Sequence, residues 1–268
     1  MKYILSNFPK YLIPVLFLIN LTGKAQNNSI QLIAHRGGVV DSSFTENGLP
    51  ALKKAMEDKY AMIETDMRVT KDGVLIANHD ADFERYYGLK EKVTEMNWAE
   101  IQKLSSKLDG NTPLKLESVL QFCAKNHMNV MLDNKIEGLD TSVFNKLLAL
   151  LDQYHLLEKA LMIGTDASTE FFTGKIKLSC TRKQLEENKA RKDYKPDHYF
   201  LFERASKISL EDVNWAQKNT IMVVAAINKF HYKKSKEMYA QYKDDCNKMM
   251  SYGIKYFQID SEFAVFLK

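Results

Sequence analysis

The sequence predicts an α/β fold in which eight parallel strands close into a TIM-type (β/α)8 barrel. Short apolar segments typical of strands alternate with amphipathic helical segments along the chain, and such alternation places helices in the crossovers between parallel strands. Residues 26–268 number 243 (268 minus 25), the usual size of one such barrel. No internal repeat or linker divides them, so we expect one barrel domain.

Residues 1–25 have the features of a cleaved secretory signal. Lys2 and Lys10 precede an apolar run at 11–19. In Gly23-Lys24-Ala25, small residues occupy the two positions that a signal peptidase recognises. The run is too short for a permanent span, although a retained N-terminal anchor is the alternative. Cleavage would remove three lysines and lower the formal charge from +4 to about +1 (4 − 3), so the charge indicates no nucleic acid partner. We expect an exported protein, periplasmic or extracellular, without a stable membrane anchor.

Apolar segments that could form strands number nine, one more than the barrel needs. The sequence leaves open which of them lies outside the barrel. The nine segments are Gln31–His35, Ala61–Asp66, Val74–Asn78, Asn129–Asp133, Ala160–Gly164, Ile176–Cys180, His198–Phe202, Ile221–Ala226 and Lys255–Ile259.

Helices are expected where apolar residues recur at spacings of three and four. This spacing is found in the segments 49–60, 141–154 and 235–252. Asn47 is expected to cap the first of these helices, and Asn97-x-x-Glu100 and Ser209-x-x-Asp212 resemble capping boxes. The three cysteines have no metal-binding spacing, so we expect buried single thiols at Cys123, Cys180 and Cys246.

Ionisable residues stand at or just beyond the ends of four of the strand segments. A Glu-x-Asp pair taken alone is typical of a solvated strand edge, but its i, i+2 spacing points both carboxylates to one side. The carboxyl ends of barrel strands meet at the mouth that carries the chemistry. The sequence therefore predicts that one mouth collects His35, Arg36, Glu64, Asp66, His79, Asp133 and Lys135.

The order of these motifs resembles the glycerophosphodiester phosphodiesterase family. The motifs are His35-Arg36-Gly37, Glu46-Asn47, Glu64-x-Asp66, Thr70-Lys71-Asp72-Gly73, His79-Asp80 and Asp133-x-Lys135. The resemblance implies metal-dependent hydrolysis of a glycerophosphodiester to glycerol phosphate and an alcohol. It also implies a small helical insertion, at about 81–127, between the strands ending at His79 and Asp133. The resemblance is dense from Ile33 to Lys135 and thin afterwards.

The residue types fit that chemistry. Three carboxylates without a thiolate, at Glu64, Asp66 and Asp133, favour a hard divalent cation, Ca²⁺ or Mg²⁺. In the resembled family, the residues matching His35 and His79 are the acid and the base, and the sequence does not distinguish which is which. A substrate phosphate could bind to the guanidinium and ammonium groups of this mouth, and a supporting carboxylate could fix the guanidinium. These three positions are Arg36, Lys135 and Glu46.

The sequence departs from the family at two places. Asp133 stands where the family most often has glutamate, and its shorter side chain would need a closer strand or an intervening water. The segment 223–228 lacks the aromatic residues of the family's late motif, which leaves the alcohol open. We expect substrate contacts from the insertion at Phe83–Tyr87, the alternative being that these aromatics only pack the insertion onto the barrel; Trp98 is expected to pack. Other functions considered are a phospholipase D-like or ring-closing lipid phosphodiesterase and a non-catalytic phosphate-binding barrel. The sequence does not indicate an oligomeric state.

Overall fold

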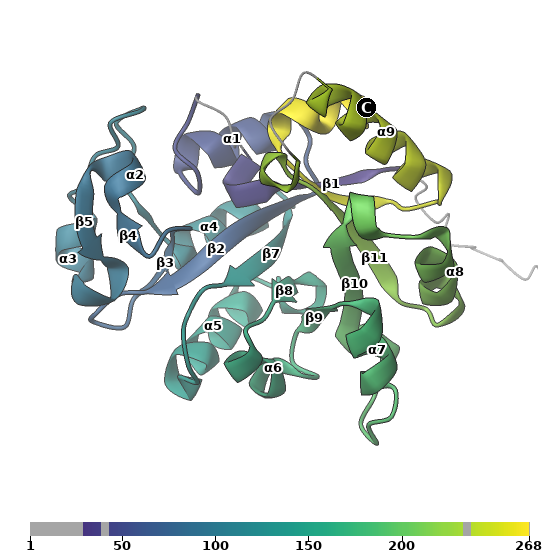
Figure 1. The fold of residues 1–268 in the computed structure, drawn as a ribbon. Coiled ribbons are helices and arrows are strands. Elements are labelled where there is room, and N and C mark those ends of the chain that lie inside the picture. Colours follow the sequence, from purple (N-terminus) through teal and green to yellow (C-terminus); the bar gives the residue numbers. More distant parts are fainter. Residues whose placement is uncertain (1–28, 39–42, 233–236, 268) are drawn as a thin grey trace, which may run out of the picture.

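Eight parallel strands form a closed barrel, as predicted. The computed structural model describes residues 29–38, 43–232 and 237–267, so the expected signal segment lies outside the described residues. The barrel closes because β1 pairs with both β2 and β12 (Figure 1). In order around the barrel the strands are β1 (Gln31–Ala34), β2 (Met62–Val69), β7 (Asn129–Asn134), β8 (Leu161–Ile163), β9 (Lys177–Cys180), β10 (Tyr199–Arg204), β11 (Met222–Ile227) and β12 (Tyr256–Ile259).

The ninth strand candidate, 74–78, lies outside the barrel. It forms β3 (Leu75–Ala77), which pairs antiparallel with the far end of β2. The long strand β2 therefore pairs with β7 along most of its length and with β3 at its end, so that β3 and then β6 continue the same sheet outside the barrel. This explains why the apolar pattern of β3 resembles that of a barrel strand.

Helices cover the outside of the barrel and join its strands (Figure 1). Their inner faces pack on the strands in one large hydrophobic cluster. The predicted capping box of Ser209 with Asp212 begins α8. The connecting helices are α1 (Leu49–Glu57), α4 (Leu116–Lys125), α5 (Thr141–Gln153), α6 (Asp166–Phe172), α7 (Arg182–Asn188), α8 (Leu210–Lys218) and α9 (Met238–Ser251).

The insertion between β2 and β7 contains strands as well as helices. Its elements are β3, β4 (Asp82–Phe83), α2 (Glu84–Tyr87), β5 (Leu89–Lys92), α3 (Trp98–Ile101) and β6 (Leu114–Lys115). It has its own small core, formed by Ile76, Phe83, Val93 and Ile101. The expected insertion, 81–127, extends too far, because its last part is α4, the barrel helix that leads into β7. Helical spacing in a sequence does not distinguish a crossover helix from a helix of the insertion.

The three cysteines are buried and unpaired, as expected. Within the described ranges, the structure has no helix with the length and apolar character that a membrane crossing requires.

Candidate active site

The side chains that point into the barrel form a floor and a mouth. A small interior cluster contains Met62 of β2, Met131 of β7 and Phe200 of β10. Every second residue of a strand faces the same side, so the residues two and four positions after each of these three also point inward. They lie nearer the carboxyl end of the barrel. They line a cavity of about 590 Å³, here called the mouth cavity. Its lining includes His35, Arg36, Asp66, His79, Asp133, Lys135, Phe202, Glu203, Arg204, Asn228, Phe230 and His231.

The three predicted carboxylates converge beside this cavity. Oxygens of Glu64, Asp66 and Asp133 all lie within 4.8 Å of one another. The parallel register of β2 with β7 pairs Asp66 with Asp133, which explains the proximity of two of them. Burial, then the carboxylates of Asp66 and Asp133, hold the pKa of Glu64 well above its ordinary value. An all-oxygen cluster of this kind fits a hard divalent cation, which would neutralise the crowded charges.

Hydrogen bonds fix the orientation of each carboxylate. The backbone N–H of Arg36 donates to Glu64 at 2.7 Å, and Lys135 Nζ donates to Asp133 at 2.6 Å. The same ammonium lies 3.6 Å from Asp66. Lys135 is therefore within reach of anything held between those two carboxylates.

Asn47 orients Asp66 and does not cap a helix. Its side-chain amide donates to Asp66 at 3.1 Å and accepts from the Thr65 hydroxyl at 2.8 Å. The cap position of α1 is Gly48, so the predicted capping role of Asn47 is wrong. The amide is engaged with β2 because the carboxylate needs a donor in a buried position.

His35 is held by a carboxylate that we did not single out from the sequence. Its Nδ1 lies 2.5 Å from Asp260 Oδ1, and both side chains are buried. The second oxygen of Asp260 accepts the backbone N–H of Lys229 at 2.7 Å. Asp260 follows β12, the strand beside β1, so the strand-end rule could have found it. An ionised Asp260 accepts a hydrogen bond from the Nδ1–H group of His35, which leaves Nε2 as the free ring nitrogen.

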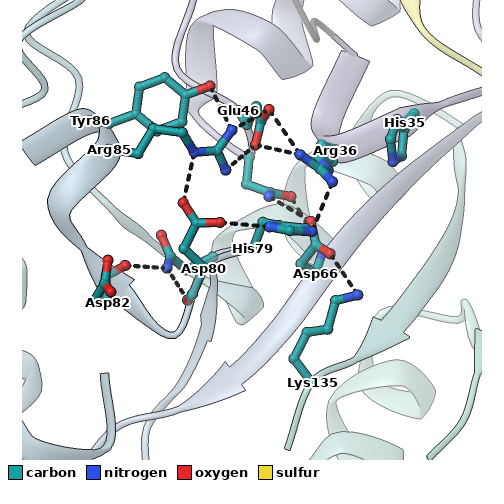
Figure 2. A network of polar contacts seen from close by, with 12 residues as sticks. His35, Arg36, Glu46, Asp66, His79, Asp80, Asp82, Arg85, Tyr86 and Lys135 are labelled. Atoms are coloured by element: carbon teal, nitrogen blue, oxygen red, sulfur yellow. Dashed lines mark hydrogen bonds and ion pairs between the residues drawn. The ribbon is translucent and has the colours of Figure 1, made fainter. Parts of the chain in front are cut away.

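His79 has the same arrangement at its Nδ1 (Figure 2). Its Nδ1 lies 2.7 Å from Asp80 Oδ1, and its Nε2 lies 2.8 Å from Nη2 of Arg36. A guanidinium can only donate, so Nε2 accepts and the proton sits on Nδ1. In this arrangement His79 presents an accepting nitrogen to the phosphate-binding candidate Arg36.

Glu46 occupies the supporting position that was predicted for it (Figure 2). It accepts from Arg36 at 3.2 Å and from both amino groups of Arg85 at 2.8 Å. Nε of Arg85 also donates to Asp80 at 2.7 Å. The hydrogen bond with His79, and then the one with Arg85, hold the pKa of Asp80 below its ordinary value. Arg85 thus joins Glu46 to the Asp80–His79 pair. It was considered for substrate contact and not for this role.

The turn after β1 requires glycine. Arg36 has φ 51° and Gly37 φ 84°, and a Cβ at Gly37 would lie 3.0 Å from the Asn47 backbone. This tight turn brings the Arg36 backbone onto Glu64 and its side chain onto Glu46.

The aromatic residues of the insertion do not line the mouth cavity. Phe83 is 2% exposed and packs edge-on against Tyr87, with ring centroids 5.8 Å apart. Tyr86 lies under the Arg85 guanidinium at 4.7 Å. Phe83 belongs to the insertion core and Tyr87 packs against it, but Phe83, Tyr86 and Tyr87 also line a small separate pocket beside Glu46 and His79. The expectation that Phe83–Tyr87 contact the substrate stays a prediction. As expected, Trp98 packs against that core.

Comparisons with known proteins follow this geometry. Residues 35–229 match the sequence model of the "Glycerophosphoryl diester phosphodiesterase family". This match spans more than half of the chain. The chain belongs to this family. It covers 26% of "Lysophospholipase D GDPD3" from Mus musculus, with 31% identity over 33% of this chain. With "Glycerophosphodiester phosphodiesterase" from Caldanaerobacter subterraneus the identity is 37%, over 28% of this chain and 30% of the relative.

Solved structures of family members share the fold. A glycerophosphoryl diester phosphodiesterase from Parabacteroides distasonis superposes with a TM-score of 0.70 at 20% identity, over 90% of this chain and 87% of that one. An Oleispira antarctica phosphodiesterase in complex with the product sn-glycerol-3-phosphate gives 0.66 at 16% identity, over 88% and 94%. The chain spans well under half of each curated relative named above, so the structures support the barrel and the relatives support the family.

Proposed function

We propose that this protein is a glycerophosphodiester phosphodiesterase that hydrolyses its substrate to glycerol phosphate and an alcohol with a divalent cation. The observation that carries the proposal is the pairing of two histidines with carboxylates at the cavity beside a three-carboxylate cluster. Binding a phosphate ester needs charge, whereas a proton-moving pair needs imidazoles held in one tautomer. The paired histidines therefore favour an enzyme over a non-catalytic binding barrel.

Glu64, Asp66 and Asp133 would hold the cation, Ca²⁺ or Mg²⁺. When bound, it supplies positive charge to the phosphoryl oxygens. Arg36 and Lys135 would add a forked contact and a point charge to the same phosphate. Glu46 and Arg85 keep the Arg36 side chain in place beside His79.

His35 and His79 supply the proton transfers. One imidazole takes a proton from the attacking water, whose oxygen bonds to phosphorus, and the other, protonated at the start of the step, gives a proton to the alcohol oxygen as its bond to phosphorus breaks. Each ring is held at Nδ1, by Asp260 or by Asp80, so in both cases Nε2 is the nitrogen that exchanges the proton. The product-bound phosphodiesterase of the same fold supports a glycerol phosphate product.

The test is release of sn-glycerol-3-phosphate from sn-glycero-3-phosphocholine, with EDTA and after adding Ca²⁺ or Mg²⁺ back. His35→Ala and His79→Ala should each lower kcat by ~10²–10⁴ while the cation still raises the unfolding temperature. Turnover that resists chelation would refute the cation's role. Near-normal turnover in either variant would remove that histidine from the mechanism.

A second candidate is hydrolysis of a lysophospholipid, as in the curated relatives named lysophospholipase D. The observation that favours it is Phe230, which lies at the mouth cavity with 63% of its surface exposed and could meet an acyl chain. Lysophosphatidylcholine offered beside glycerophosphocholine discriminates the two. A higher kcat/KM for the lipid, lost in Phe230→Ser, would favour the second candidate.

We also propose export, on the composition of residues 1–25. Expression of the full chain in a host with a secretory pathway should yield a protein beginning near Gln26 in the exported fraction. An intact N-terminus in the membrane fraction would instead indicate a retained anchor.

A further inference from the structure

The wall of the mouth cavity facing the carboxylate cluster contains an arginine that the proposed mechanism does not use. β10 lies four strands from β2 in either direction around the barrel, so the ends of these two strands face each other across the mouth. Arg204 is the last residue of β10 and lines the cavity. The substrate phosphate is expected at the other side, beside Arg36 and Lys135.

Strand alternation directs Arg204 inward. Phe200 belongs to the interior cluster of the barrel and Phe202 packs against it. The next residue on the same face is Arg204. Arg204 is therefore the next inward-facing side chain of β10 after these two phenylalanines, and it lies where the barrel interior opens to solvent.

This guanidinium has no anionic partner among the residues that the structure describes. The other cations of the cavity are engaged, Arg36 with Glu46 and Lys135 with Asp133. The side chain of Arg204 takes part in none of the ion pairs or hydrogen bonds found in the described segments. The adjacent Glu203 directs a carboxylate oxygen to the Arg204 backbone N–H at 2.9 Å.

His231 adds no second positive charge near Arg204. Burial, followed by the charge of Arg204, lowers the pKa of His231 to about 4, so this imidazole is neutral at neutral pH. Phe202 and Phe230 are aromatic residues of the same cavity lining, and Phe230 lies against His35. A ligand reaching the β10 wall meets the Arg204 guanidinium, next to Glu203, whose carboxylate accepts the Arg204 backbone N–H.

We propose that Arg204 selects glycerophosphodiesters whose head group carries a carboxylate, such as serine, over those with choline or ethanolamine. The inference rests on the proposed function and names its substrate class. A guanidinium binds a carboxylate through two parallel hydrogen bonds, whereas a quaternary ammonium would be repelled. A substrate whose phosphate lies beside Lys135 would extend its head group across the cavity to β10.

The experiment compares kcat/KM for sn-glycero-3-phosphoserine, -phosphoethanolamine and -phosphocholine in wild type and Arg204→Met. Lys207→Met is the matched control, since Lys207 is an exposed cation three residues on that does not line the mouth cavity. Wild type should favour the serine diester. Arg204→Met should lose roughly tenfold on it, mainly through KM, because the lost charge-assisted contact is partly exposed to solvent. Choline turnover should stay within about twofold, and Lys207→Met should resemble wild type.

Salt gives a second readout, because an ionic contact at an open mouth is screened. The preference for serine should shrink at high salt in wild type and be insensitive to salt in Arg204→Met. Equal losses on serine and choline, or a wild-type preference for choline, would overturn the inference while leaving the phosphodiesterase proposal intact. If no diester is cleaved, the phosphodiesterase proposal fails, and equilibrium binding decides the inference separately. Weaker binding of the serine diester by Arg204→Met would support it, and unchanged binding would overturn it.

Discussion

Replacing Asp260 with asparagine tests whether the tautomer of His35 matters for catalysis. The two side chains are nearly inaccessible, and Asp260 Oδ1 lies 2.5 Å from His35 Nδ1. Its Oδ2 accepts the backbone N–H of Lys229 at 2.7 Å. Asparagine has the same shape but only one accepting oxygen, so it cannot serve both donors.

The orientation of the new amide follows from these contacts. If the NH₂ group faced Lys229, two donors would oppose each other in a buried site, which is costly. The oxygen therefore stays on Lys229 and the NH₂ group faces His35, while the Asn228 amide, whose Nδ2 lies 3.4 Å from Asp260 Oδ1, turns to present its oxygen. Nδ1 must then accept, and the proton moves to Nε2, which can no longer act as a base. An imidazolium would also lose its carboxylate partner, so the acid role suffers as well.

We expect Asp260→Asn to lower kcat by about 10²–10⁴, the usual contribution of positioned acid–base catalysis. The assay is release of glycerol phosphate from glycerophosphocholine across pH, with the unfolding temperature measured alongside. Asp193→Asn is the matched control, because this exposed carboxylate, ahead of β10, has Arg191 as its ion-pair partner in the part of the chain that the structure describes. Turnover within about threefold of wild type with an unchanged pH profile would show that His35 does not depend on Asp260.

Three further predictions concern the cation, pH and the insertion. At 100-fold excess over its Kd, Ca²⁺ or Mg²⁺ should raise the free energy of unfolding by about 2.7 kcal/mol, and Asp66→Asn should abolish most of this rise; an equal rise in the variant would contradict the cation site. His231, with a pKa lowered to about 4 by burial, stays neutral in the folded protein while the unfolded chain protonates below its ordinary value of 6.5. The free energy of unfolding should fall as pH falls from 6.5 to 4. The fall should be less steep in His231→Gln than in wild type or in the control His155→Gln, and the same pH dependence in all three proteins would refute this. Arg85→Met should lower kcat roughly tenfold and move the pH profile, because Asp80 loses its guanidinium partner, whereas a change in thermal stability alone would indicate a purely structural role.

Strand-end reasoning predicted most of the candidate site because it depends only on local pattern. Glu64 and Asp66 share a face of one strand, and Asp133 and Lys135 share a face of another, so each pair is fixed by period-two alternation. The parallel pairing of β2 with β7 then brings the pairs together. The same reasoning did not exclude β3 from the barrel, since an apolar segment shows that it is buried but not which strand it pairs with.

The carboxylate partners of the two histidines differ in their distance along the chain, which decides how easily each can be predicted. Asp80 is adjacent to His79 in the chain, so its contact is local. Asp260 is 225 residues from His35, and only closure of the barrel between β1 and β12 brings them together. For the insertion, a position after a strand end does not say where a ring points, and Phe83 packs into the core that an excursion of this length needs.

Barrel closure and catalytic geometry are therefore linked at one turn. Arg36 has φ 51°, a conformation that a non-glycine residue adopts at a cost. The turn is held from both neighbouring strands. On one side the carboxylate of Glu64, on β2, accepts the Arg36 backbone N–H, and on the other Asp260, after β12, accepts from the His35 ring. Opening the barrel at either side of β1 would release one of these contacts, so the orientation of His35 and Arg36 depends on all eight strands being closed.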